Sequence, residues 1–347
     1  MNAIVFGGYG VFGSLVARGL ADTGIKVTIA GRDEAKARAM AASIKGASIA
    51  ADVHERDSCA RAVAGQQVVV NCSGPFNATH TKLLEGCLAA GVHYVDIADD
   101  RQWCRRVYES DASFRQKGLT LAWGCSSFPG ISGALAAALN EHEPTPPDSV
   151  RCSLFIGNRN PKGYAAVRSA VGMIGRKIQA PQGILRGWSD LESVELPLPF
   201  GRRKLLNAEA PDYDLMPKLL GVKQVVVKAG FELPVSNLLF RLLAACGPIW
   251  GAGMARLLWL SGKPLGWIGR SGGAITCELT YGERVKRGSA SGGDGAQKLA
   301  AWPAILVARA LCEGQDIKRG AVTAFEAIGT RKLLAELQDA GFQVRLD

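Results

Sequence analysis

The sequence predicts an α/β protein in which a doubly wound parallel sheet is followed by a second, mixed α+β domain. Three observations predict this fold class. Apolar strand patterns alternate with helical patterns up to about residue 125, a glycine-rich turn joins the first strand to the first helix, and a proline-rich segment at 144–147 ends the alternation. Regular alternation of strands and helices is typical of a parallel sheet with helices on both faces.

The strands expected in the first domain are short apolar runs separated by helical patterns. They lie at residues 2–6, 26–30, 47–51, 67–72, 93–97 and 119–123. This alternation indicates a doubly wound sheet of the Rossmann type. Because ligands of such sheets bind at the carboxyl ends of the strands, the loops that follow the strands hold the candidate site residues.

A different pattern begins after the proline-rich segment. Strands are expected at 150–157, 192–198, 222–231 and 273–287, and a helix near 164–175. Helical patterns return at 296–310 and 330–340, and we expect this last stretch to pack against the first domain. The sequence therefore predicts one domain at 1–143 plus about 294–347, with a second domain at 144–293 inserted into it.

The first turn carries the spacing G-x-G-x-x-G at Gly8, Gly10 and Gly13, between a strand and a helix that opens with Val11 and Phe12. This arrangement seats a pyrophosphate on the N-terminus of the helix. The first domain is therefore predicted to bind a dinucleotide. The alternative is a glycine loop that only turns the chain.

The end of the second strand distinguishes between the two nicotinamide dinucleotides. An NAD site usually has a carboxylate there, which binds the ribose 2′-hydroxyl and repels a 2′-phosphate. This chain has Gly31 and then Arg32, whose guanidinium suits a phosphate. NADP(H) is therefore the predicted cofactor. In the alternative interpretation Arg32 is only a solvated residue and Asp33 only a helix cap.

Two further strand ends contribute candidate cofactor-binding residues. Asp52 and Val53 follow the third strand and are expected near the adenine. Ser73, Gly74 and Pro75 follow the fourth strand. His80, in the next helical turn, is expected either to contact substrate or to lie on a solvated face.

Hydride transfer needs a group that gives or takes the accompanying proton near the strand ends. Tyr94 and Asp96 lie two residues apart on the fifth strand, so their side chains share a face. Cys125 follows the sixth strand and is the third candidate catalytic residue. The alternatives are a core tyrosine with a satisfied hydroxyl and, around Cys125, a helix N-cap.

Composition excludes several classes of protein. The chain has 347 residues and nine cysteines, an odd number without a C-x-x-C pair, which favours neither a disulfide framework nor a zinc site. Only four histidines are present, so no metal site is expected. The first residues form a strand pattern and not a signal sequence, and a cytoplasmic protein is expected.

The net charge of +10 belongs to the middle of the chain, where residues 151–290 hold 20 Lys and Arg against 9 Asp and Glu. Such an excess favours an acidic small-molecule substrate or an anionic membrane surface as the partner. A lipid-like substrate is the alternative that the apolar residues 233–269 leave open. The basic residues are scattered and lack an aromatic platform, so nucleic acid is not an expected partner.

Residues 233–269 contain no acidic residue, and their basic residues are Arg241, Arg256 and Lys263. The longest uncharged run, 242–255, is shorter than the ~20 residues that cross a bilayer. Two interpretations stay open. The favoured one has apolar helices that cover the substrate cavity or form a homodimer interface, and the other has a basic amphipathic element in peripheral contact with a membrane.

Several segments carry a resemblance to a known family: the glycine loop, Ala30-Gly31-Arg32, and residues 69–76, 87–96, 128–132 and 320–342. Through them the chain resembles the saccharopine dehydrogenase-like oxidoreductases. The resemblance implies NAD(P)(H) binding and hydride transfer at a C=N, C=O or C=C bond of a small amino-acid-derived or hydrophobic substrate. After Asp96, where relatives commonly have a glycine and a glutamate, this chain has Asp99 and Asp100. The alternative is a non-catalytic NADP(H)-binding or membrane-associated adaptor.

Overall fold

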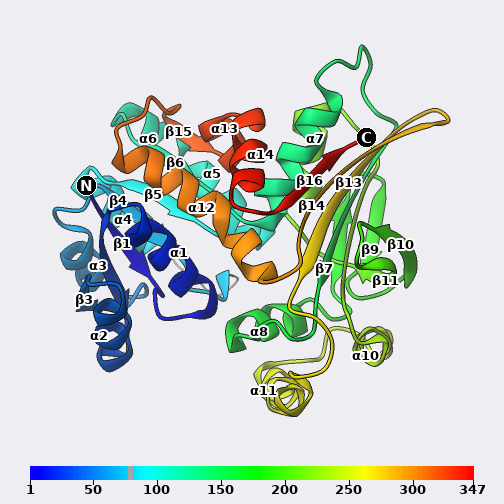
Figure 1. Ribbon diagram of the computed structural model, residues 1–347, viewed down its shortest axis with the longest axis horizontal. Helices are drawn as coiled ribbons and strands as arrows, with labels where there is room; N and C mark the ends of the chain where they lie inside the picture. The colour runs from blue at the N-terminus through cyan, green and yellow to red at the C-terminus, as the bar shows by residue number, and fades with distance from the viewer. Residues whose placement is uncertain (77–80) are drawn as a thin grey trace. The chain divides into compact units, whose positions relative to one another are not determined.

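The computed structural model describes residues 1–76 and 81–347, so His80 lies outside the described residues. The described chain divides into two compact units by its internal contacts. Unit 1 comprises residues 1–126 and 300–329, and unit 2 comprises residues 127–299 and 330–347. Figure 1 shows their elements, and each unit is described by itself.

Unit 1 is built on a parallel sheet. Its strands are β1 (Asn2–Phe6), β2 (Lys26–Gly31), β3 (Ala47–Ala50), β4 (Val68–Asn71), β5 (His93–Asp96), β6 (Thr120–Ala122) and β15 (Gly320–Val322). Among the described residues these seven strands follow the order β15-β6-β5-β4-β1-β2-β3, and every neighbouring pair is parallel. The strand order reverses beside β1, which pairs with both β2 and β4, and this is the switch point where doubly wound sheets bind ligands.

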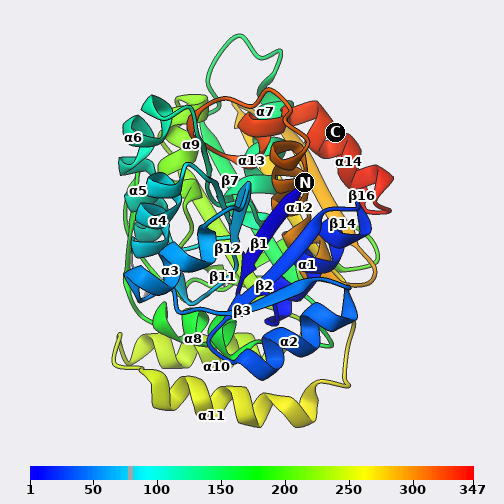
Figure 2. The same ribbon diagram turned by 90° about the vertical axis from the view of Figure 1, so that its left-hand side faces the viewer.

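The helices of unit 1 connect these strands. They are α1 (Val11–Asp22), α2 (Glu34–Ser43), α3 (Arg56–Val63), α4 (Lys82–Ala90), α5 (Arg101–Glu109), α6 (Asp111–Gln116), α13 (Ala324–Ile328) and the part of α12 (Ala296–Cys312) from residue 300 onward. Figure 2 shows β1, β2 and β3 beside one another with α1 and α2. Residues 3–6 of β1 and 68–70 of β4 are completely buried, as expected for central parallel strands covered on both faces.

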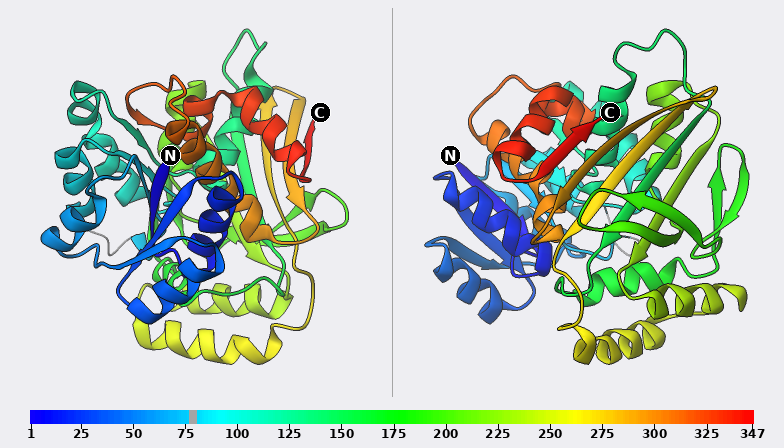
Figure 3. Two further views of the ribbon diagram at one scale, coloured as in Figure 1. Left: turned by 60° about the vertical axis from the view of Figure 1, so that its left-hand side comes forward. Right: turned by 45° about the vertical axis from the view of Figure 1, so that its right-hand side comes forward.

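Unit 2 is built on a mixed sheet. Its strands are β7 (Ser149–Ile156), β10 (Glu192–Leu196), β11 (Gly201–Asn207), β12 (Val225–Phe231), β13 (Gly273–Tyr281), β14 (Arg284–Gly292) and β16 (Gln343–Leu346), and a separate hairpin pairs β8 (Lys177–Ala180) with β9 (Gly183–Arg186). Within the described chain the order is β10-β11-β12-β7-β13-β14-β16, and all pairs are antiparallel except β12 with β7. The long hairpin of β13 and β14 is yellow to orange in Figure 3.

The helices of unit 2 are α7 (Ser132–Asn140), which follows the turn η2 (Ser127–Ile131), α8 (Tyr164–Gly172), α9 (Asp212–Leu220), α10 (Pro234–Ala245), α11 (Ala252–Gly262) with the short η3 (Lys263–Leu265), and α14 (Thr330–Asp339). Helix α7 packs against β13, β14 and α9. Helices α8, α10 and α11 share an apolar core that includes Val171, Phe240 and Ala255.

The predicted fold class is confirmed: the six strands expected up to residue 125 are β1 to β6, and a mixed sheet follows. The boundaries differ from the sequence interpretation in two places. Residues 127–143 belong to unit 2, because α7 buries Ala134, Leu135 and Leu139 against the mixed sheet. Helix α14 groups with unit 2, where it packs against α7 and β16, whereas the sequence interpretation assigned it to the first domain.

The second domain holds more regular structure than its sequence predicts. Residues 273–287, expected as a single strand, are a hairpin that turns at Gly282, where φ is +59°. The strands β8, β9 and β11 and the helix α9 lie in a stretch rich in Gly and Pro. Their partial exposure leaves no clear apolar periodicity, which is the signal that identified the buried strands.

Candidate functional site

The glycine loop between β1 and α1 is folded tightly on itself. A Cβ on Gly13 would lie 2.2 Å from the carbonyl oxygen of Gly7, and a Cβ on Gly8 would lie 2.9 Å from that of Val5. Gly10 is the N-cap of α1, with φ −74°, and is exposed. Gly8 and Gly13 are therefore required by close backbone packing, whereas a Cβ on Gly10 would meet one atom of the loop, the Gly7 carbonyl oxygen at 3.1 Å.

The first turn of α1 is free to bind an anion. Gly10 supplies no side-chain cap, and the first turn has no acidic residue. In the chain as described, the amide groups of Val11, Phe12 and Gly13 donate to no protein acceptor. Free amides at a helix N-terminus, beside bare glycine backbone, fit the pyrophosphate of a dinucleotide.

The end of β2 is arranged for a 2′-phosphate. Asp33 is occupied as the N-cap of α2, since its Oδ1 accepts a hydrogen bond from the amide of Lys36 at 3.0 Å. This contact and the Lys36 ammonium lower the pKa of the Asp33 carboxyl. Arg32 is exposed and forms no ion pair with any described residue. The structure thus leaves a guanidinium, and not a carboxylate, available at this strand end.

Tyr9 fixes the glycine loop to the end of β2. A Cβ on Gly31 would lie 2.4 Å from Cε1 of the Tyr9 ring, and the Tyr9 hydroxyl accepts a hydrogen bond from the Asp33 amide at 3.2 Å. The loop that holds the pyrophosphate and the strand end that carries Arg32 are therefore connected by one side chain.

The ends of β3 and β4 lie at the same edge of the sheet. Asp52 Oδ1 accepts a hydrogen bond from the His54 amide at 2.9 Å, and Val53 is buried. The Ser73 amide donates to Asn71 Oδ1 at 3.0 Å, and the following Gly74–Pro75 peptide is cis. A Cβ on Gly7 would lie 2.8 Å from the Cys72 carbonyl oxygen, so the β4 loop contacts the glycine loop directly. All candidate cofactor-binding residues thus follow the carboxyl ends of β1 to β4.

Tyr94 and Asp96 form a buried polar network. Both side chains are completely buried, and the Tyr94 hydroxyl donates to Asp96 Oδ2 at 3.2 Å while accepting from Asn71 Nδ2 at 3.0 Å. Asp96 Oδ2 also accepts from Trp103 Nε1 at 2.9 Å, and its Oδ1 accepts from the Gly124 amide at 2.8 Å. Burial raises the pKa of Asp96, while these hydrogen bonds oppose the shift. The network connects the ends of β4, β5 and β6.

Cys125 is also completely buried, and its amide donates to the Asp96 carbonyl oxygen at 2.8 Å. Burial, followed by the charge of Asp96, raises the pKa of the Cys125 thiol well above its usual value. The thiol therefore stays protonated at neutral pH and lacks the thiolate character of a reactive cysteine.

The sequence interpretation did not include Asp99 among the site residues. Asp99 follows β5 and is exposed, yet desolvation by the surrounding atoms and the charge of Asp100 raise its pKa to about 6. Asp100 itself is occupied as the N-cap of α5, accepting from the Trp103 amide at 2.9 Å. An acidic residue in the loop that follows a central parallel strand is the sequence signal that identifies this position.

Comparison with known proteins agrees with this geometry. The family model described as "Saccharopine dehydrogenase NADP binding domain" matches residues 4–121, which supports NADP(H) as the cofactor. No curated protein matches the sequence. The solved structure "Apo histidine-tagged saccharopine dehydrogenase (L-Glu forming) from Saccharomyces cerevisiae" is similar over 100% of this chain and 99% of that chain, with a TM-score of 0.69 and 13% identity.

Other solved structures are similar over a smaller part. A short-chain type dehydrogenase/reductase from Mycobacterium ulcerans covers 35% of this chain and 65% of its own, with 17% identity and a TM-score of 0.30. RhlG from Pseudomonas aeruginosa, in complex with NADP, covers 35% and 69%, with 15% identity and a TM-score of 0.30.

The family model and the full-length structural match together confirm the resemblance seen in the sequence, and they support an oxidoreductase. Residues 4–121 of this chain match the family of saccharopine dehydrogenase NADP-binding domains, and the chain shares the fold of saccharopine dehydrogenase along its whole length.

Proposed function

We propose that this protein is an NADP(H)-dependent oxidoreductase that transfers a hydride to or from a C=N, C=O or C=C bond of a small amino-acid-derived or hydrophobic substrate. The proposal rests on two sets of polar groups beside the switch point that have no partner among the described residues. They are the first-turn amides of α1 and the guanidinium of Arg32. When bound, NADP(H) supplies the hydride donor or acceptor.

The chain's own residues bind and orient the cofactor in this proposal. The amides of Val11, Phe12 and Gly13 bind the pyrophosphate, and Arg32 binds the 2′-phosphate with a charge-assisted hydrogen bond. Asp52 and Val53 lie beside the adenine. The loop from Ser73 to Pro75 continues the site beyond the glycine loop.

We assign the proton transfer to Asp99. Asp99 is an exposed residue of the loop that follows β5, and partial desolvation of its carboxyl raises its pKa to about 6, which lets it hold or release a proton near neutral pH. Tyr94, Asp96 and Cys125 are completely buried, which supports a positioning role for the polar network they belong to, in place of the proton transfer that the sequence predicted.

The test is to follow NADPH absorbance at 340 nm in the presence of a panel of imines, ketones and enoyl compounds. The proposal predicts substrate-dependent loss of NADPH with at least one class. Asp99→Asn is expected to reduce the turnover number by about 10²-fold or more and to leave the NADPH affinity unchanged. NADPH binding without consumption under every condition would favour the non-catalytic adaptor instead.

A further inference from the structure

A large part of the exposed apolar surface of this chain is concentrated in one short segment. Of the seventeen large apolar side chains exposed in the described chain, ten belong to residues 235–268, so they form a local feature and not a scatter. We call this set the α10–α11 surface. It consists of Val235, Leu238, Leu239, Leu242, Ile249, Leu257, Leu260, Leu265, Trp267 and Ile268.

Helix α10 is apolar on two opposite faces. Its inner face buries Asn237, Phe240 and Ala244 in the core shared with α8 and α11. Its outer face carries four large apolar residues at spacing i, i+3, i+4 and i+7, which is one continuous stripe of a helix: Val235, Leu238, Leu239 and Leu242. The inner face of α10 already covers the apolar core. The interpretation of this segment as a cover for the substrate cavity therefore does not explain the exposed apolar stripe on the outer face.

Helix α11 and the turn after it continue this apolar surface. Leu257 and Leu260 are one helical turn apart and exposed, and Trp267 is 77% exposed. The helix is held firmly on unit 2, because Trp259 Nε1 donates to the Lys162 carbonyl oxygen at 2.9 Å and its ring contacts Tyr164 on α8. Figures 1 and 2 show α10 and α11 at the same edge of unit 2.

The charges on the α10–α11 surface itself have a single sign, and the neighbouring Glu232 is largely buried, with its Oε2 accepting from the amides of Asn158 and Arg270. Residues 233–270 include no Asp or Glu, and neither does α8, which packs on α11 and carries Arg168. Arg168, Arg241 and Arg256 are exposed and form no ion pair with any residue the structure describes. Lys263 lies over the ring of Trp259, with its Nζ 3.9 Å from the ring centroid.

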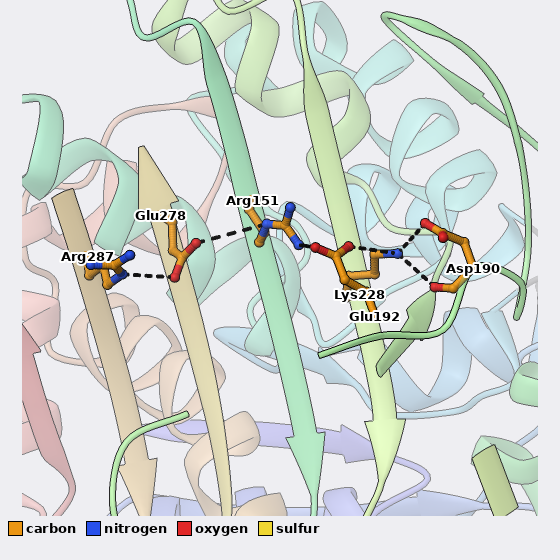
Figure 4. Close-up of polar contacts among 6 residues, drawn as sticks. All are labelled: Arg151, Asp190, Glu192, Lys228, Glu278 and Arg287. Carbon is orange, nitrogen blue, oxygen red and sulfur yellow. Dashed lines mark hydrogen bonds and ion pairs between the residues drawn. The ribbon is translucent and has the colours of Figure 1, made fainter. Parts of the chain in front are cut away.

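Several acidic residues of unit 2 form ion pairs on or beside the mixed sheet, away from the α10–α11 surface. Figure 4 shows a chain of alternating charges across it, in which the completely buried Lys228 Nζ lies 2.6 Å from Asp190 Oδ2 and 3.2 Å from Glu192 Oε2. Arg151 pairs with Glu192, and Arg287 Nε lies 3.1 Å from Glu278 Oε1. The basic residues in this chain of contacts are thus paired with carboxylates, whereas Arg168, Arg241 and Arg256 are not.

We propose that the α10–α11 surface docks the protein on an anionic membrane surface. Exposed leucines on two helices, an exposed tryptophan in the turn that follows them, and unpaired arginines are the composition of an element that lies in the headgroup region. No helix of the described chain is long and apolar enough to cross a bilayer, so the contact is peripheral. The proposal does not depend on the proposed enzymatic activity.

A second copy of this chain fits the surface less well. A two-fold symmetric interface brings the same patch of both copies together, so the unpaired Arg241 and Arg256 of one copy would face basic and no acidic residues of the other. Anionic lipid headgroups neutralise these guanidinium groups directly.

The test is flotation of the purified protein with vesicles of phosphatidylcholine alone and with about 30% phosphatidylglycerol, at low and high salt. We expect binding only to the anionic vesicles and weaker binding at high salt. The double variant Arg241→Gln/Arg256→Gln should reduce the partition coefficient about thirtyfold. Leu238→Glu/Leu242→Glu should reduce it by about a hundredfold or more.

Matched controls lie outside the surface in the same unit. Leu198→Glu alters an exposed leucine, and Arg345→Gln/Lys223→Gln removes two exposed basic residues; both should bind vesicles like the wild type. NADPH binding and the melting temperature should be unchanged in all variants. No flotation at low salt, or a wild-type dimer that Leu238→Glu/Leu242→Glu dissociates, would overturn the proposal.

Discussion

The glycine loop gives a sharp prediction, because two of its glycines are required for different reasons. Gly10→Ala and Gly13→Ala each add one methyl group. At Gly10 the nearest described atom to the new Cβ is the Gly7 carbonyl oxygen at 3.1 Å, and the backbone φ of −74° suits alanine. At Gly13 the new Cβ would lie 2.2 Å from the same oxygen and 2.8 Å from the Gly7 carbonyl carbon.

The two methyl groups therefore have different expected costs. Alanine at the N-cap position lowers the free energy of unfolding by about 1 kcal/mol and the melting temperature by ~3 °C. The Gly13 methyl forces a backbone shift of the loop, which costs about 1–3 kcal/mol or more, and the melting temperature falls by up to ~10 °C. Because the Gly10 methyl occupies the outer side of the loop, the bound pyrophosphate loses hydrogen bonds worth about 3 kcal/mol, or about a hundredfold in Kd.

The assay combines thermal unfolding with an NADPH titration by calorimetry. Gly10→Ala should lose NADPH affinity with only the small loss of stability given above, whereas Gly13→Ala should lose affinity and a larger part of its stability. The matched control is Gly86→Ala in α4, where a Cβ finds its nearest atom at 3.6 Å; it should bind NADPH normally and melt no lower than the wild type. Wild-type NADPH affinity in Gly10→Ala would refute the assignment of the pyrophosphate to this loop.

Three further predictions concern carboxylates. Asp96→Asn turns an amide N–H toward donors such as Trp103 Nε1, so chemical denaturation should show a free energy of unfolding lower by about 2–4 kcal/mol. A change of no more than about 0.5 kcal/mol, which is usual for a surface substitution, would contradict the network. Burial raises the pKa of Asp212 to about 7 from 3.8, so the folded state favours the protonated form; this contribution to stability is complete below pH 3.8 and is lost as the pH rises toward 7. Asp212→Asn should flatten the wild-type decline in stability over that range, and an unchanged slope would argue against a raised pKa. Asp99 must be protonated to act as an acid, so the rate of substrate reduction should fall above about pH 6; this bend should be absent in Asp99→Asn, and its persistence would assign the proton to another group.

The sequence predicts unit 1 well because its strongest signals are local. The buried runs of β1 and β4 and the glycine spacing before α1 depend on nearest neighbours in the chain. The three-residue strand β15 was not among the expected strands, because its place beside β6 depends on pairing across about 200 residues.

The candidate site is only partly readable from the sequence. The period of a strand places Tyr94 and Asp96 on one face, and the structure confirms that they form a hydrogen bond. Their complete burial depends on Trp103 of α5, whose indole reaches Asp96 from another element. The raised pKa of Asp99 likewise depends on surrounding atoms and on Asp100, and composition alone contains no such information.

The most direct measurement of the central claim is calorimetric titration of the wild type and of Arg32→Asp with NADPH and with NADH. We expect the wild type to bind NADPH about ten- to a hundredfold more tightly than NADH, because a charge-assisted hydrogen bond to the 2′-phosphate contributes about 1.5–3 kcal/mol. Arg32→Asp should remove this preference and leave the NADH affinity nearly unchanged. An equal loss of affinity for both dinucleotides, or no heat of binding with either, would contradict the account.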